Sequence, residues 1–288
     1  MDAIRYDAPL SLTEAIRLIH ADPGASVMAG GTDLLVQVRA GLKHPTAFID
    51  LKRIPELVGV TIDAQGLRLG AATCAAELGE NEECRRLWPG LAEAAALIGS
   101  MQIQGRGSVG GNLCNASPAA DTPCALIVNR ALCVVAGPEG ERLIPVEDFV
   151  IGPGRTVLAR GELLVAIRLP RPTGRTSDAY LRLTPRSEMD IAVVGAAVSL
   201  TLDRSGMCTA ARVAIAAVAP TPLLVPEAAA ALVGSVVDKT ALARAAAAAS
   251  AAARPIDDKR GTIAYRHQVA GVLTGRAAVA ACRRAKGN

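Results

Sequence analysis

A short run of small and polar residues, Ala29-Gly30-Gly31-Thr32-Asp33, lies between an apolar stretch and an apolar helix start. Adjacent glycines allow backbone N–H groups to approach an anion closely, and the Thr32 hydroxyl adds a donor. A helix that begins directly after them contributes the favourable dipole of its N-terminus. The run therefore predicts a site for a pyrophosphate, although a tight strand-to-helix turn without a ligand explains the same residues.

A second glycine-rich segment contains the pattern G-x-G-x-x-G at Gly105, Gly107 and Gly110. In a dinucleotide-binding βαβ unit this pattern follows a strand and opens a helix, with an acidic residue about 20 positions later. That context is missing here, because residues 113–123 carry asparagine, serine and proline, which interrupt helices. We interpret the segment as a long polar loop suited to phosphate, ribose and a flavin edge. Its side-chain partners are Asn112, Asn115, Ser117 and Asp121.

The elements that must position these two segments follow from the spacing of apolar residues. The first segment lies between a short buried strand and a helix within residues 25–41, and Gln65-Gly66 forms the turn of a hairpin within 58–73. Further strands are expected at 47–54, 131–137, 141–146, 162–170, 190–203 and 208–220. Further helices are expected at 12–20, with Ser11 as N-cap, and at 91–99, 240–253 and 265–284.

The clearest internal boundary is the proline- and glycine-rich cluster at residues 170–174. With 288 residues the chain is long enough for two domains. Strands and helices are segregated rather than regularly alternated, which favours an α+β fold over a doubly wound parallel sheet.

Composition excludes several classes of protein. The 31 basic and 27 acidic residues are mixed, and only six residues are aromatic, so nucleic-acid binding has little support. No segment approaches the ~20 unbroken apolar residues of a membrane span, and the N-terminus lacks the pattern of a signal peptide, so a cytoplasmic protein is expected. The seven cysteines contain no C-x-x-C pair, which indicates buried reduced thiols rather than a metal site. The basic stretch 254–286 is interpreted as a solvated helix face, with contact to a partner protein as the alternative.

At the two glycine segments the sequence resembles the FAD-binding subunits and domains of the xanthine dehydrogenase/molybdenum hydroxylase family. The resemblance rests on MAGGTDLL at 28–35, GSVGGNLCNASPAADTP at 107–123, GELLVAIRLP at 161–170 and RSEMDIAVVGAAVSL at 186–200. It implies a two-lobed vanillyl-alcohol-oxidase-like (PCMH-type) FAD-binding domain at residues 1–172. A small α+β C-terminal flavoprotein domain of the carbon monoxide dehydrogenase type follows at 177–285.

The resemblance also implies which residues contact FAD. The first loop, which wraps the pyrophosphate, comprises Val27, Met28, Ala29, Gly30, Gly31, Thr32, Asp33 and Leu34. The opposing loop comprises Ser108, Val109, Gly110, Gly111 and Asn112. Asp121 matches an acidic residue near the polar part of the flavin, Leu163 a residue whose backbone meets the ring, and Arg182 the position of a family lysine. Ile98 occupies a position where some relatives place an aromatic side chain against the ring.

Several of these positions have a structural alternative. The glycines can serve turn geometry alone, Asp121 can cap a helix that begins at Thr122-Pro123, and Arg182 can form a surface ion pair. Asp190 is interpreted as structural. No residue of this chain is assigned as a catalytic group or a metal ligand.

The implied function is electron transfer within an oxidoreductase complex. FAD in this chain takes electrons from the [2Fe–2S] clusters of a small partner subunit and passes them to an external acceptor. The molybdopterin cofactor lies on a large partner subunit, and a dimer of heterotrimers is expected. The NASPAADTP segment resembles the xanthine-type and heterocycle-hydroxylating relatives more than those that oxidise carbon monoxide. A stand-alone flavin-dependent oxidase of the same fold is the alternative.

Overall fold

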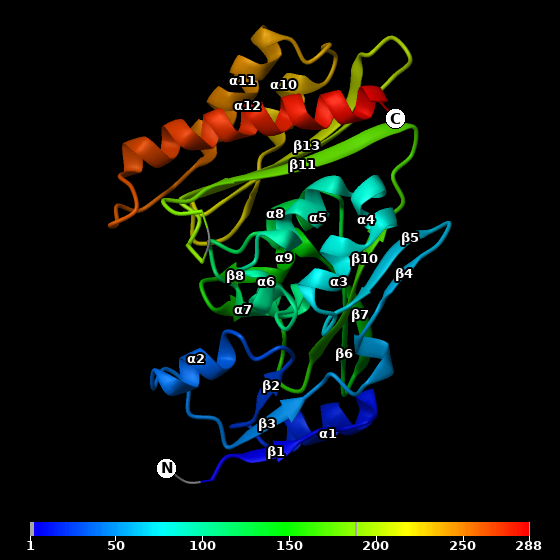
Figure 1. The fold of residues 1–288 in the computed structure, drawn as a ribbon, viewed down its shortest axis with the longest axis vertical. Helices are drawn as coiled ribbons and strands as arrows, with labels where there is room; N and C mark the ends of the chain where they lie inside the picture. The colour runs from blue at the N-terminus through cyan, green and yellow to red at the C-terminus, as the bar shows by residue number, and fades with distance from the viewer. Residues whose placement is uncertain (1–2, 188, 288) are drawn as a thin grey trace.

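The computed structural model describes residues 3–187 and 189–287. Figure 1 shows three layers that follow the order of the chain: an N-terminal lobe, a central lobe and a C-terminal domain. The described part of the chain contains no helix that is both long enough and apolar enough to cross a bilayer.

The N-terminal lobe is a three-stranded parallel sheet with two connecting helices. Strands β1 (Arg5–Asp7), β2 (Ser26–Met28) and β3 (Ala47–Asp50) are arranged in the order β1-β3-β2. Helix α1 (Leu12–Ala21) joins β1 to β2, and its N-cap is Ser11, whose hydroxyl accepts the Glu14 N–H as predicted. Helix α2 (Leu34–Arg39) follows the first glycine loop. The expectation of a buried strand before this loop is wrong, because β2 is only partly buried.

The central lobe contains a five-stranded antiparallel sheet in the order β4-β5-β10-β6-β7. Its strands are β4 (Val60–Ile62), β5 (Gly66–Gly70), β6 (Leu132–Gly137), β7 (Gly140–Pro145) and β10 (Leu163–Pro170). The short strands β8 (Val150–Gly152) and β9 (Arg155–Thr156) pair separately, and η1 (Pro55–Leu57) is a 3-10 turn. The accompanying helices are α3 (Ala75–Glu80), α4 (Glu82–Leu87), α5 (Pro89–Ala96), α6 (Met101–Gln104), α7 (Val109–Asn115), α8 (Thr122–Val128) and α9 (Val146–Phe149).

The interpretation of residues 101–123 as a long loop is wrong, because this segment forms α6, α7 and the start of α8. Glycines inside a helix cost about 1 kcal/mol each, so local propensity argues against α7. The Ser108 hydroxyl compensates by accepting the Gly111 N–H at 2.9 Å, and Val109 and Leu113 are fully buried. The helix ends where Ala116 adopts a left-handed backbone conformation, with φ of 50°.

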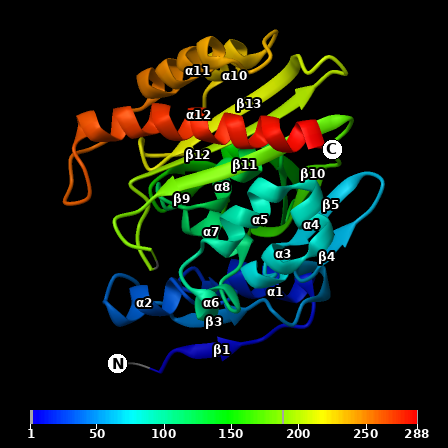
Figure 2. The same ribbon diagram turned by 45° about the horizontal axis from the view of Figure 1, so that its top comes forward.

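The C-terminal domain is a four-stranded antiparallel sheet between two layers of helices. Strands β11 (Arg175–Leu183), β12 (Val194–Leu202), β13 (Cys208–Ala216) and β14 (Leu223–Leu224) follow in chain order. Helices α10 (Pro226–Leu232), α11 (Lys239–Ala252) and α12 (Ile263–Gly287) cover the outer face, as Figures 1 and 2 show. Helices α5 and α8 of the central lobe contact the other face. The C-terminal domain is therefore packed against the central lobe rather than tethered to it.

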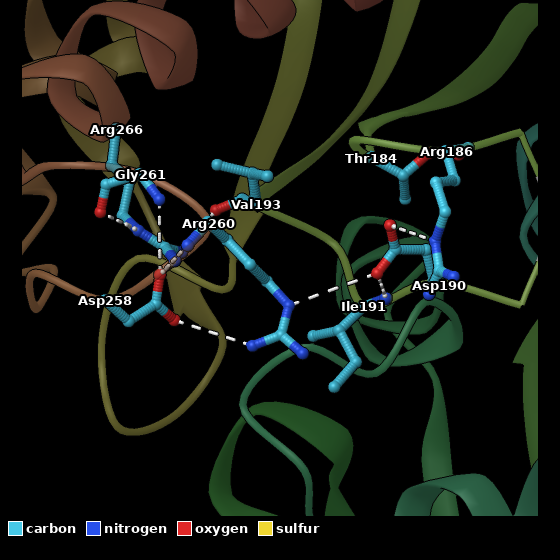
Figure 3. Close-up of polar contacts among 9 residues, drawn as sticks. All are labelled: Thr184, Arg186, Asp190, Ile191, Val193, Asp258, Arg260, Gly261 and Arg266. Atoms are coloured by element: carbon cyan, nitrogen blue, oxygen red, sulfur yellow. Dashed lines mark hydrogen bonds and ion pairs between the residues drawn. The ribbon is translucent and has the colours of Figure 1, made fainter.

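Two loops of the C-terminal domain are joined by a group of charged side chains (Figure 3). Arg266 is almost fully buried and donates to the carbonyls of Val193 and Ala217 and to the Asp258 carboxylate. Asp190 accepts the Ile191 N–H at 2.8 Å and pairs with the Arg186 guanidinium at 3.3 Å. These contacts fix the loops that lead into β12 and α12, in agreement with a structural role for Asp190.

Asp178 stands at the junction between the C-terminal domain and the central lobe. Its carboxylate accepts the Gly90 N–H at 3.0 Å and the Asn129 amide at 2.6 Å, and its backbone carbonyl accepts from Arg284. Burial raises the pKa of Asp178 to about 6, although the hydrogen bonds and Arg284 oppose the rise. The residue therefore holds a proton more tightly in the folded protein than in the unfolded chain.

The junction predicts how stability changes with pH. The unfolded aspartate has a pKa of about 3.9, so Asp178 stabilises the fold fully below about pH 4 and loses that contribution as the pH rises through about 6. The Asp178→Asn variant should lack this pH-dependent contribution, so its free energy of unfolding relative to the wild type should increase by about 2 kcal/mol between about pH 4 and pH 7. Equilibrium urea unfolding at both pH values measures the difference.

Asp203→Asn is the matched control, because hydrogen bonds in an exposed turn lower the pKa of Asp203. Its pH-dependent contribution therefore lies below about pH 4 and leaves the wild-type slope above it intact. Parallel pH profiles for the wild type and Asp178→Asn would contradict the assignment.

Candidate functional site

A cavity of about 380 Å³ lies between the N-terminal lobe and the central lobe. Both glycine segments line it, although they are more than 70 residues apart in the sequence. The predicted site residues that line it are Val27, Met28, Ala29, Gly30, Gly31, Thr32, Asp33, Leu34, Ser108, Gly110, Gly111, Asn112 and Leu163. The structure thus places most of the predicted site around one cavity.

The two glycine segments lie against each other, backbone to backbone. A Cβ atom at Gly30 would lie 1.8 Å from the Arg106 carbonyl oxygen, and one at Gly107 would lie 3.2 Å from the Thr32 hydroxyl. Gly31 has a φ of +74°, a conformation that residues with side chains rarely adopt. Glycine is therefore required here for the approach of the loops as well as for the turn.

The first loop is anchored from behind by a lysine that the sequence alone did not single out. The Lys52 ammonium donates to the Ala29 carbonyl at 2.8 Å and pairs with Asp50 at 2.6 Å. Asp50 in turn accepts the Tyr6 hydroxyl at 2.5 Å. This chain of contacts fixes the loop to the parallel sheet, and only the position of Lys52, two residues after the end of β3, could have suggested it.

Helices α2 and α7 both begin at the cavity, and the first amides of a helix have no partner within it. A negatively charged group in the cavity therefore meets donors and a favourable dipole from both lobes. Gly110 contributes mainly through packing, because a Cβ atom there would lie 2.3 Å from the Ala71 carbonyl oxygen. A Cβ atom at Gly111 would lie 2.8 Å from the hydroxyl oxygen of Ser108.

The cavity also contains charged side chains, of which Asp33 belongs to the predicted set and Lys43 and Glu162 do not. Burial raises the pKa of Asp33, and the nearby Lys43 opposes the rise. Glu162 is held by Arg142 through two contacts of 2.8 Å. Other polar lining residues missed in the site prediction are Ser26, Gln37 and Cys114. Gln37 donates to Asn115, a predicted side-chain partner of the second segment, at 3.0 Å and so links α2 to the end of α7. Their spacing in the sequence carries no recognisable motif.

Aliphatic side chains form the remaining wall of the cavity. Ile98 and Leu163 line it together with Leu158 and Leu164, and none of the lining residues is aromatic. A flat ring bound here would therefore meet aliphatic surface from this chain rather than a stacked aromatic side chain. Ile98 lines the cavity, and its contact with a bound ring stays a prediction.

Three of the predicted site residues do not line the cavity: Val109, Asp121 and Arg182. Val109 is fully buried in the hydrophobic core. Asp121 accepts the Arg182 guanidinium at 2.8 Å and the Tyr180 hydroxyl at 2.9 Å. Burial raises the pKa of Asp121, while Arg182 and Tyr180 oppose the rise.

The structure agrees only in part with the alternatives of a helix cap for Asp121 and a surface ion pair for Arg182. The Asp121 side chain does not cap α8, and the ion pair is buried rather than on the surface, with both side chains less than a tenth exposed. Removing one partner would leave an uncompensated buried charge, which typically costs about 3–5 kcal/mol. Contact of these residues with a cofactor stays a prediction.

The cysteines of the chain are all free. Five are buried, but Cys74 and Cys114 are only partly so, which corrects the expectation that all are buried. Burial raises the pKa of Cys114, at the cavity, to about 12. Within residues 3–187 and 189–287, no group of three or more histidine, cysteine or acidic side chains is arranged to hold a metal ion.

Comparison with protein families gives two matches that together cover most of the chain. Residues 2–172 match the FAD binding domain in molybdopterin dehydrogenase, and residues 179–281 match the CO dehydrogenase flavoprotein C-terminal domain. The carbon monoxide dehydrogenase medium chain of Afipia carboxidovorans is 36% identical over 282 residues, which are 98% of this chain and 97% of the relative. The xanthine dehydrogenase FAD-binding subunit of Escherichia coli O157:H7 is 34% identical over 224 residues, or 77% and 76% of the two chains.

Solved structures agree with these matches. A chain of carbon monoxide dehydrogenase from Hydrogenophaga pseudoflava superposes with a TM-score of 0.93 at 36% identity, covering 98% of both chains. A chain of quinoline 2-oxidoreductase from Pseudomonas putida 86 superposes with a TM-score of 0.91 at 30% identity, also over 98% of both. The expected similarity of the NASPAADTP segment to xanthine-type and heterocycle-hydroxylating relatives stays a prediction. The chain belongs to the family of FAD-binding medium subunits of molybdenum hydroxylases.

Proposed function

We propose that this chain holds FAD between its two glycine loops and relays electrons from a small [2Fe–2S] subunit to an external acceptor. A large partner subunit carries the molybdopterin cofactor, and the complex is a cytoplasmic dimer of heterotrimers. The observation that carries the proposal is the contact between Gly30 and the Arg106 carbonyl, which places two helix N-termini around one cavity.

The donor groups and the aliphatic wall of the cavity fit FAD. The backbone of residues 29–34 and 108–112 would hold the pyrophosphate, with Thr32 and Asn112 as side-chain partners. The surface formed by Ile98 and Leu163 would hold the flavin ring. Asp121 and Arg182 would act from behind the cavity wall, since their charges already compensate each other at 2.8 Å. When bound, FAD supplies a carrier that accepts electrons singly and delivers them in pairs.

The two parts of the chain have different roles in this proposal. Residues 1–172 bind the cofactor, and residues 177–285 form a domain whose sheet packs on α5 and α8. A stand-alone oxidase would need a proton-abstracting group at the ring. Histidine is not among the lining residues, and Glu162 is already held by Arg142, which leaves Asp33 as the acid to consider.

Gly30→Ala tests the position of the cofactor. The added methyl group would collide with the Arg106 carbonyl and push the loops apart. Overpacking of this kind costs about 1–3 kcal/mol. We expect FAD binding to weaken by about 10- to 100-fold. The ratio of flavin to protein after desalting, and the dissociation constant by fluorescence titration, measure this directly.

Gly275→Ala is the matched control, because nothing lies within 4 Å of its Cβ position and the residue is inside α12. It should keep its FAD and gain up to about 1 kcal/mol of stability. Circular dichroism of both variants separates loss of the cofactor from loss of the fold. Full retention of FAD by a folded Gly30→Ala protein would place the cofactor elsewhere.

The relay itself predicts dependence on a partner. The small subunit, reduced anaerobically and freed of reductant, should bleach the visible absorbance of the flavin when mixed with the FAD-loaded chain in a stopped-flow instrument. The oxidised small subunit should not. Candidate organic substrates should leave the flavin of the isolated chain oxidised, because in this proposal the substrate reacts at the molybdopterin cofactor of the large subunit. Rapid reduction of the lone chain by such a substrate would instead establish the oxidase.

A further inference from the structure

A second cleft, of about 340 Å³, lies where the linker between β10 and β11 passes the C-terminal sheet. We call it the linker cleft. It is bordered by the end of α8, by residues 170–173 and by β11, β12 and β13. None of the residues that line it also lines the cavity between the glycine loops. It is therefore separate from the proposed FAD site.

The side chains that line the linker cleft carry positive charge and no negative charge. Arg130, Arg171 and Arg212 line it, and no aspartate or glutamate does. Arg212 pairs with Glu147 at 2.7 Å, and Arg171 pairs with Glu83 at 3.2 Å, but neither carboxylate is part of the lining. Glu83 also pairs with Arg86, so its single charge is shared between two arginines. The cleft thus keeps an excess of positive charge.

Several donors in the cleft have no acceptor. Arg130 makes no ion pair or side-chain hydrogen bond with any residue between 3 and 287 that the structure describes, and its own φ is +56°. Arg212 uses Nε for the Ile127 carbonyl and Nη2 for Glu147, which leaves Nη1 unpaired among the described residues. The hydroxyl of Ser199, a residue only 9% exposed, likewise has no partner in the described chain. Unpaired donors of this kind are costly unless water or a ligand accepts from them.

Strand register brings these donors to one face of the sheet. Ser199 lies opposite Arg212 on the neighbouring strand, and Thr201 lies opposite Ala210. Because side chains alternate along a strand, all four point to the side that carries the cleft. The carboxyl end of α8 also borders the cleft, and its partial negative charge would repel an anion. Arg212 donates to the Ile127 carbonyl and Asn129 to the Ala125 carbonyl, and these hydrogen bonds offset that charge.

We propose that the linker cleft is a binding site for the phosphate group of a small molecule. The planar guanidinium groups of Arg130 and Arg212 match the oxygens of a phosphate, and the Ser199 hydroxyl completes the donor set. A ligand held there contacts both the linker and the C-terminal sheet, so its binding stabilises the junction between the two parts of the chain.

Inorganic phosphate is the probe, titrated by calorimetry into the full chain with its FAD bound, at constant ionic strength. We expect saturable binding of one phosphate per chain. Arg130→Gln should weaken it by about tenfold or more, as expected for loss of a charged hydrogen bond. Ala210→Asp, which adds a carboxylate beside Thr201, should abolish it without touching any donor.

Arg204→Gln is the control, because it removes the same charge from an exposed position outside the cleft. It should leave phosphate affinity unchanged. Equal weakening by Arg130→Gln and Arg204→Gln, or the absence of saturable binding to the wild type, would overturn the site. Binding of succinate in preference to phosphate would overturn its assignment to a phosphate group.

Discussion

The site depends on the close approach of two backbones. The Cα of Gly30 faces the Arg106 carbonyl with no room for a single methyl group, and this contact joins the N-terminal lobe to the central lobe. Because α2 and α7 begin on either side of it, the same contact aims two helix N-termini into one cavity. A larger residue in either loop would separate the lobes and the donors together. Packing and ligand binding therefore place the same demand on these glycines.

The remaining structure holds this contact in place from two directions. Lys52 fixes the first loop to the parallel sheet through the Ala29 carbonyl, and Ser108 caps α7 behind the second loop. On the far side, α5 and α8 carry the C-terminal sheet, whose β11 contributes Arg182 to the buried pair with Asp121. The C-terminal domain is thus joined to the central lobe by a buried ion pair as well as by helix packing.

Much of this arrangement could be predicted from the sequence. The strand-turn-helix around Gly30 and Gly31 and the helix capped by Ser11 both rest on local signals. Helix α7 could not be predicted, because its glycines oppose helix formation and only the cap and the burial of Val109 and Leu113 overcome them. Lys52, Glu162 and the pairing of Asp121 with Arg182 depend on contacts between distant segments, for which one sequence carries no signal.

Hydrogen–deuterium exchange, compared between the FAD-free and FAD-loaded chain, tests most directly whether both loops hold the cofactor. We expect slower exchange on FAD binding at residues 28–37 and 107–113 together, since amides of both loops acquire an acceptor, with no change in the outer helix α12. Protection of one loop alone, or protection centred outside these segments, would contradict the claim that the contact between the loops builds the FAD site.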